Sequence, residues 1–191
     1  MKKINEIIKY LPALPEPLSA DVYFAEGENF CYIVDVGNNE QAVQEISSVT
    51  KKKIVILSHY HKDHTGNVDK LEYKELYVGD LTYETIQKGI IVTEKMVIQD
   101  GIELVIQPCP SPHVKGSLIV TINKEYTLLA DLYFTKAGYD KELARQMLQT
   151  LEKLDTKYFV VSHQSEKNVF EKQELLERLV NDFFAELSES E

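Results

Sequence analysis

The stretch that decides the fold is Ile54-Val55-Ile56-Leu57-Ser58-His59-Tyr60-His61-Lys62-Asp63-His64. Its four leading apolar residues predict a short buried strand over residues 54–57. His59 and His61 are two residues apart, so an extended backbone directs both side chains to the same side, where they can share one metal ion. Asp63 and His64 follow where the chain turns, and they can face a second position close to the first. The stretch therefore predicts two adjacent metal sites directly after a buried strand.

The remaining histidines of the chain complete an ordered series. The sequence has 5 histidines, and the two outside this stretch are His113 and His163, with Asp131 between them. The pattern His-x-His-x-Asp-His should arise by chance in roughly 2 of 10,000 sequences of this composition, so we treat it as a functional motif. Seven side chains are then candidate metal ligands: His59, His61, Asp63, His64, His113, Asp131 and His163.

Imidazole and carboxylate ligands suit Zn²⁺, and also Fe or Mn. The two cysteines, Cys31 and Cys109, have no partner at metal-ligand spacing, and we expect them to be structural or incidental thiols. The absence of cysteine ligands argues against a purely structural zinc. Water held between two such cations can lose a proton near neutral pH, since even one zinc lowers its pKa from 15.7 to about 7. The series therefore predicts hydrolysis by a metal-bridging hydroxide.

Short apolar runs alternate with helical patterns, which predicts an α/β fold. We expect strands at residues 21–25, 30–35, 54–57, 75–78, 103–107, 118–122, 127–130 and 158–161. We expect helices at residues 40–49, 81–88, 141–154 and 166–187.

Length and composition suit one domain spanning residues 1–191, with the last predicted helix at its C-terminal end. The broad apolar face of that helix predicts core packing, with a homodimer contact as the alternative. A net charge of −10 disfavours nucleic acid and anionic membranes as partners. No apolar run reaches the roughly 18 residues needed to cross a bilayer, and no export signal precedes the first predicted strand. We expect a cytoplasmic protein that acts on a small molecule.

Several motifs resemble those of the metallo-β-lactamase superfamily, and the resemblance spans about residues 20–163. Besides the histidine stretch, Asp35-Val36-Gly37 looks like the Asp-x-Gly that closes an early hairpin, Pro112-His113-Val114-Lys115-Gly116-Ser117 resembles a Gly-His-x-x-Gly-Ser segment, and Leu129-Ala130-Asp131 is similar to the strand before a bridging aspartate. The resemblance implies an αββα sandwich, in which two mixed sheets pack together with helices outside.

The resemblance also implies how the ligands divide between the two metals. It assigns His59, His61 and His113 to the first metal and Asp63, His64 and His163 to the second, with Asp131 bridging them. Asp63 would in addition act in catalysis, by orienting the hydroxide and passing its proton to the leaving group. Four positions depart from the usual family pattern, since Pro112, Ala130, Ser162 and Gln164 stand where glycine is common, and these residues give the local backbone less freedom than glycine would.

The sequence thus predicts a binuclear hydrolase, with two Zn²⁺ ions or else Fe or Mn, that cleaves an ester, thioester or lactone-like bond of a small molecule. The metal motif is similar to that of glyoxalase II, but the chain beyond His163 offers one predicted helix and no helical glutathione-binding region. A mononuclear iron persulfide dioxygenase, with iron on the equivalents of His59, His113 and Asp131, is the first alternative. A noncatalytic metal-binding module is the second alternative.

Overall fold

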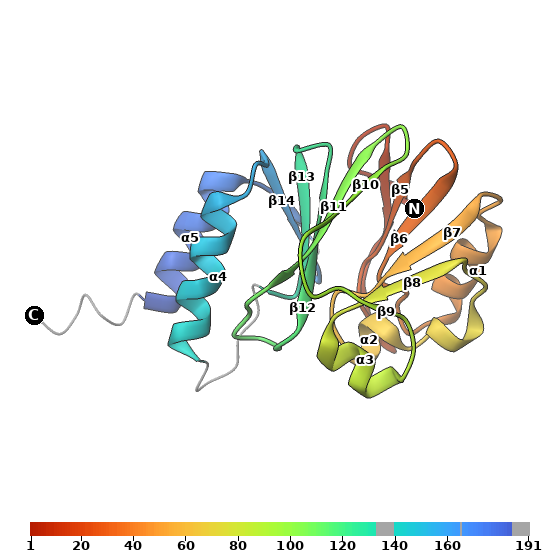
Figure 1. Ribbon diagram of the computed structural model, residues 1–191, viewed down its shortest axis with the longest axis horizontal. Coiled ribbons are helices and arrows are strands. Elements are labelled where there is room, and N and C mark those ends of the chain that lie inside the picture. Colours follow the sequence, from red (N-terminus) through yellow and green to blue (C-terminus); the bar gives the residue numbers. More distant parts are fainter. Residues whose placement is uncertain (133–139, 165, 185–191) are drawn as a thin grey trace, which may run out of the picture.

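Two β-sheets packed face to face form the centre of the protein, and helices cover the outer face of each sheet (Figure 1). The computed structural model describes residues 1–132, 140–164 and 166–184. Within these residues the first sheet has the strand order β1-β2-β5-β6-β7-β8-β9 and the second the order β10-β11-β12-β13-β14-β15, while β3 and β4 form a separate hairpin.

The strands of the first sheet are β1 (Lys2–Lys3), β2 (Ile8–Leu11), β5 (Val22–Glu26), β6 (Phe30–Val34), β7 (Lys52–Ile56), β8 (Glu75–Val78) and β9 (Ile90–Ile91). Those of the second are β10 (Met96–Gln99), β11 (Glu103–Cys109), β12 (Ser117–Ile122), β13 (Tyr126–Ala130), β14 (Tyr158–Val161) and β15 (Val169–Glu171), and the hairpin consists of β3 (Leu14–Pro15) and β4 (Leu18–Ser19). Both sheets are mixed: β6 to β9 run parallel, as do β13 and β14, and the other neighbours are antiparallel.

The alternation of side chains along the strands explains why the sheets are covered on both faces. In β7, Ile54 and Ile56 point into the core between the two sheets, whereas Val55 packs with Ala42 and Ile46 of helix α1 (Glu40–Ser48) on the outer face. Helix α3 (Asp80–Ile86) adds partly buried side chains to the same outer layer, next to the short α2 (Lys62–Thr65) and the 3₁₀ turn η1 (Val68–Lys70). A strand with apolar residues on both faces is stable only when both faces are buried.

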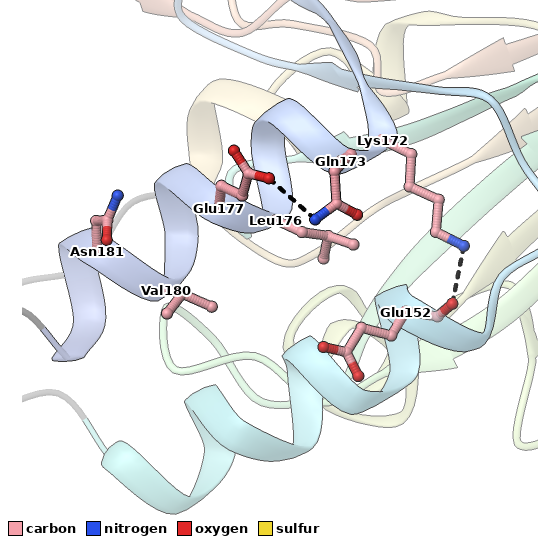
Figure 2. A pocket seen from close by; sticks show the side chains of 7 residues that line it. All are labelled: Glu152, Lys172, Gln173, Leu176, Glu177, Val180 and Asn181. Carbon is pink, nitrogen blue, oxygen red and sulfur yellow. Dashed lines mark hydrogen bonds between the residues drawn. The ribbon is translucent and has the colours of Figure 1, made fainter.

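Helices α4 (Lys141–Lys153) and α5 (Lys172–Phe184) cover the outer face of the second sheet (Figure 1). Phe159 of β14 packs there against Met147 and Leu151 of α4 and Leu175 of α5. The two helices are joined at one end, where Lys172 Nζ donates to the backbone carbonyl oxygen of Glu152 at 2.8 Å (Figure 2). Lys172 Nζ also donates to the carbonyl oxygen of Leu154, at 2.7 Å. These bonds satisfy carbonyl groups that the last turn of a helix leaves without an intrahelical partner. The layers therefore follow the order α, β, β, α, as the family resemblance implies.

All eight strands and the first three helices expected from the sequence are present, with ends that shift by at most two residues. The sequence reading missed β1, β2, β9, β10, β15 and the β3–β4 hairpin. β10 illustrates the reason, because Val97 and Gln99 are exposed while Met96 and Ile98 are only partly buried at the edge of the sheet. Such edge strands are short and carry too weak an apolar pattern to be recognised.

The last helix begins later than predicted. Residues 169–171 of the expected helix form β15, which pairs antiparallel with β14 and places Phe170 opposite Phe159, so the expected start at residue 166 is wrong. Phe170 is buried with Leu175 and Leu179. It therefore packs into the core that the predicted helix was expected to cover, but it does so from a strand. Residues 185–187 of the expected helix lie outside the described residues. The buried face of α5 supports core packing, and a homodimer contact stays a prediction.

No helix in the described ranges is both long and apolar enough to cross a membrane.

Strained backbone occurs at the ends of the strands that lead into the histidine cluster. Asp35 after β6, Ala130 at the end of β13 and His163 after β14 have φ angles of 61°, 49° and 57°. Left-handed backbone costs a residue with a β-carbon about 1–2 kcal/mol. Surrounding contacts must supply that energy, and such strain is found where function constrains the chain.

We predict that Ala130→Gly keeps or increases stability, because glycine adopts a left-handed conformation without steric cost. Ala25→Gly is the matched control, since Ala25 is equally buried but lies in regular β5 and should lose about 1 kcal/mol. Urea denaturation in the presence of a chelator gives both free energies of unfolding for the same metal state. An equal loss in the two variants would show that the backbone at Ala130 is not strained.

Candidate metal centre

The seven predicted ligands meet at one end of the sandwich, where loops from both sheets come together. β13 and β14 are parallel neighbours, so Asp131 and His163, which follow their carboxyl ends, lie at the same edge (Figure 1). The loop after β7 and the short helix α2 supply the four ligands of the first half of the chain, and the loop between β11 and β12 supplies His113. A backbone hydrogen bond from Leu118 N to Ser58 O, at 2.7 Å, fixes these two loops to each other.

Three histidines form the first group of donors. His59 Nε2 lies 3.1 Å from His61 Nδ1, and His113 Nε2 lies 3.2 Å from the same atom. Nitrogen ligands at about 2.0–2.1 Å from a tetrahedral zinc are roughly 3.4 Å apart, so the ring spacing suits one shared ion. These three side chains and no carboxylate make up the group.

Two histidines and two aspartates form the second group. His163 Nε2 lies 3.0 Å from Asp63 Oδ2, and His64 Nε2 lies 3.3 Å from Asp131 Oδ2. One ligand atom from each of these four side chains falls within 4.8 Å of the others. Asp131 Oδ2 is also 3.8 Å from His113 Nε2 of the first group. The two groups are therefore adjacent, and Asp131 lies between them.

Buried polar atoms at the centre indicate that a cation fits there. His64 Nε2 and Asp131 Oδ1 are both buried and have no hydrogen-bond partner among the described residues. Leaving a buried polar group without a partner costs about 1–3 kcal/mol. Since imidazole nitrogen and carboxylate oxygen are ordinary ligands of divalent metals, bound ions would remove this cost. The donor set thus fits two metal ions.

Ser58 and Asp35 orient His59 and His64 through hydrogen bonds to their Nδ1 atoms. The Asp35 carboxylate accepts hydrogen bonds from Ser58 N and Ser58 Oγ, both at 2.8 Å, and pairs with His64 Nδ1 at 2.7 Å. Because Ser58 Oγ donates its one hydrogen to Asp35, it accepts the bond from His59 Nδ1, at 2.9 Å. His59 Nε2 is then left unprotonated and faces His61. Contacts of this kind fix the tautomer and direction of metal-binding histidines.

Asp21 holds the loop that carries His163. Its Oδ2 accepts bonds from Ser162 Oγ and His163 N, both at 2.8 Å, while Oδ1 accepts from Ala13 N at 3.2 Å. Asp21 is 1% exposed and precedes β5 of the first sheet, so one carboxylate connects the two halves of the sandwich. The sequence analysis noted Asp35 as part of the Asp-x-Gly motif but did not predict that it orients a ligand, and it did not single out Asp21. The signal for Asp21 was an acidic residue at the boundary of an apolar strand.

The two groups differ in their electrostatics. Burial, reinforced by the other rings, lowers the pKa of His59, and burial together with His113 lowers the pKa of His61, so both rings are neutral lone-pair donors. Burial would also lower the pKa of His64, but Asp35 and Asp131 outweigh it and raise that pKa to about 10. The second group therefore attracts positive charge through its carboxylates, and the first does so through neutral nitrogen atoms.

The two cysteines take no part in the centre. Both are buried free thiols, and burial raises the pKa of Cys31 to about 11 and that of Cys109 to about 12. They remain protonated at neutral pH, as structural thiols do.

Known proteins resemble this chain in sequence and in fold. A family model described as the metallo-beta-lactamase superfamily matches residues 15–75, which include the first four ligands. An uncharacterised protein of Aquifex aeolicus (strain VF5) is 30% identical over 128 residues, which are 64% of this chain and 58% of that protein. The chain thus matches a little over half the length of that relative.

Solved structures share the fold at low sequence identity. A B3 metallo-beta-lactamase with an active-site glutamic acid superposes with a TM-score of 0.72 at 11% identity, covering 98% of this chain and 91% of that one. The chemotaxis sensor ODP, solved as a peroxy diiron species, gives a TM-score of 0.69 at 12% identity, covering 97% and 98%. At such identities the likeness shows the fold alone. Taken together, the family match over the histidine stretch and the shared fold support membership of the metallo-β-lactamase superfamily.

Proposed function

We propose that the protein is a binuclear metal-dependent hydrolase that cleaves an ester, thioester or lactone-like bond in a small molecule. The observation that carries the proposal is that seven donor side chains form two adjacent groups with Asp131 between them. A purely structural site would need only one closed set of four ligands. Two Zn²⁺ ions suit the donors, and iron or manganese also suits them, as the diiron relative illustrates.

Paired metal ions, when bound, activate a water molecule and stabilise negative charge that develops on the substrate. The protein's own groups would hold and orient the reactants around them. Asp63 is the group suited to move a proton, since its side chain is 14% exposed and therefore reachable from solvent. Its carboxylate would orient the attacking water and carry a proton to the leaving group. Burial raises the pKa of Asp63, but the hydrogen bond with His163 and the nearby His64 outweigh burial, so the pKa lies below its ordinary value.

Asp131 and the carboxylates behind the ligands would set the geometry. Asp131 is 6% exposed and lies within 4 Å of His64, His113 and His163, so it would be placed to hold both metals and fix their separation. Asp35 would fix the orientation of the His64 ring, and Asp21 would fix the position of His163. Positioning of this kind matters because small displacements of reacting groups cost large factors in rate.

Anaerobic hydrolysis is the experiment that tests the proposal. Protein loaded with two equivalents of Zn²⁺ should hydrolyse at least one member of a panel of esters, thioesters and lactones without taking up oxygen. Oxygen consumption on a persulfide with a single iron per chain would instead establish the dioxygenase. Failure of the entire panel in the fully metallated protein would support a noncatalytic metal-binding module.

Asp131→Ala should lower metal occupancy and hydrolysis together, with activity falling on the order of a hundredfold or more, because it removes the group between the two metals. Asp155→Ala is the control, since the Asp155 side chain is 82% exposed and far from the ligands in the fold. Elemental analysis and the rate on the best substrate are the two measurements. Full retention of both by Asp131→Ala would contradict the bridging role.

Asp21→Asn should weaken the second metal site about 10- to 100-fold and spare the three-histidine site, because asparagine offers one acceptor where the carboxylate uses two oxygens. Asp100→Asn is the matched control. Asp100 is similarly buried and accepts bonds from Asn29 N, Phe30 N and Tyr32 OH at another place in the fold. The Asp100→Asn variant should be less stable than the unsubstituted protein but keep its affinity for metal. Titration with Co²⁺, followed by its absorption, separates the two sites, and equal metal affinity in both variants would remove Asp21 from the positioning role.

A further inference from the structure

A hollow of about 430 Å³ opens directly beside His163. An apolar wall consists of Pro12, Ala13 and the β3–β4 hairpin residues Leu14, Pro15 and Leu18, and His163 also lines the hollow. The exposed Lys2 and the half-buried Gln164 also line it. A volume of this size is in the range of small-molecule sites. The hollow thus continues the metal centre outward along a largely apolar surface.

Hydrogen bonds from the metal centre hold the base of this hairpin. Ala20 N, just after β4, donates to Asp63 O at 3.0 Å, and Ala13 N, just before β3, donates to Asp21 Oδ1 at 3.2 Å. Ser19 Oγ accepts from Asn38 N at 2.9 Å. Both ends of the hairpin are therefore fixed to residues that carry or position ligands. The apolar wall has a defined place relative to His163.

The wall exposes apolar surface that packing would normally bury. Leu18 is 55% exposed although its neighbour Ser19 is fully buried, and Leu14 is partly exposed. Covering such surface with an apolar group gains about 25 cal/mol per Å². An extended aliphatic chain that runs from a bond at the metal centre past His163 would cover it, whereas a compact polar substrate would leave it in water.

We propose that this hollow binds an aliphatic chain of the substrate, so that the preferred substrates are esters, thioesters or lactones bearing an unbranched chain of several carbons. This inference rests on the proposed hydrolase function. The wall residues Leu14 and Leu18 determine specificity, and the reaction itself remains with the metal centre. Each methylene that enters the hollow should improve binding about fourfold.

A binding experiment tests the hollow without any turnover. The chain contains no tryptophan, so Leu18→Trp places a single tryptophan at the wall, and its emission can be excited selectively. Titration of the zinc-loaded variant with straight-chain carboxylates from acetate to decanoate should shift its emission to the blue, with affinity rising about fourfold per methylene. Ile90→Trp is the matched control, because Ile90 is 51% exposed on β9 and does not line the hollow. Its emission should not respond.

A kinetic experiment then tests specificity. Two ester series, one lengthened on the acyl side and one on the alcohol side, should show kcat/KM rising with chain length in at least one series. Leu14→Ser and Leu18→Ser should flatten that rise, and Ile90→Ser should keep it.

The outcomes separate the two proposals. A length-dependent response of the Leu18→Trp reporter without hydrolysis of any ester, thioester or lactone would support the hollow and contradict the hydrolase. Hydrolysis with no length dependence, together with a silent reporter, would support the hydrolase and overturn the aliphatic site. A rise of kcat/KM with chain length that persists in both Leu14→Ser and Leu18→Ser would also overturn the aliphatic site.

Discussion

The metal centre depends on a constraint between the two sheets: donor groups from each half of the chain must meet within a few ångströms. Four of the seven follow β7 in the first sheet, and three follow strands of the second. The buried Asp21 carboxylate joins the halves through Ser162 and His163, and the backbone bond from Leu118 to Ser58 joins them again beside His113. Without these links neither group of ligands would be complete.

The same contacts supply the energy for the strained backbone at the centre. His163 adopts a left-handed conformation in which its N–H reaches Asp21 and its Nε2 reaches Asp63. Asp35 is strained in the same way and is held by Ser58 and His64. Buried carboxylates that accept several hydrogen bonds can stabilise such turns. Strain, orientation of ligands and packing of the sheets are therefore parts of one arrangement.

Much of the fold and the membership of the seven-residue cluster could be predicted from the sequence. Buried strands such as β7 carry continuous apolar runs, and the spacing of His59, His61, Asp63 and His64 places them near one another by local geometry alone. Asp21 and Asp35 could not be predicted, because their role depends on loops about 140 and 30 residues away in the sequence. β15 was read as helix because Phe170 fits the apolar pattern of α5, and only its pairing with β14 reveals a strand. The hairpin beside His163 was missed because its two-residue strands have no periodicity to detect.

The most direct test of the central claim is the metal content of freshly purified protein, measured by elemental analysis against protein concentration. Two adjacent donor groups should retain two transition-metal ions per chain. A stoichiometry of one that does not rise when zinc, iron or manganese is supplied in excess would contradict the paired centre.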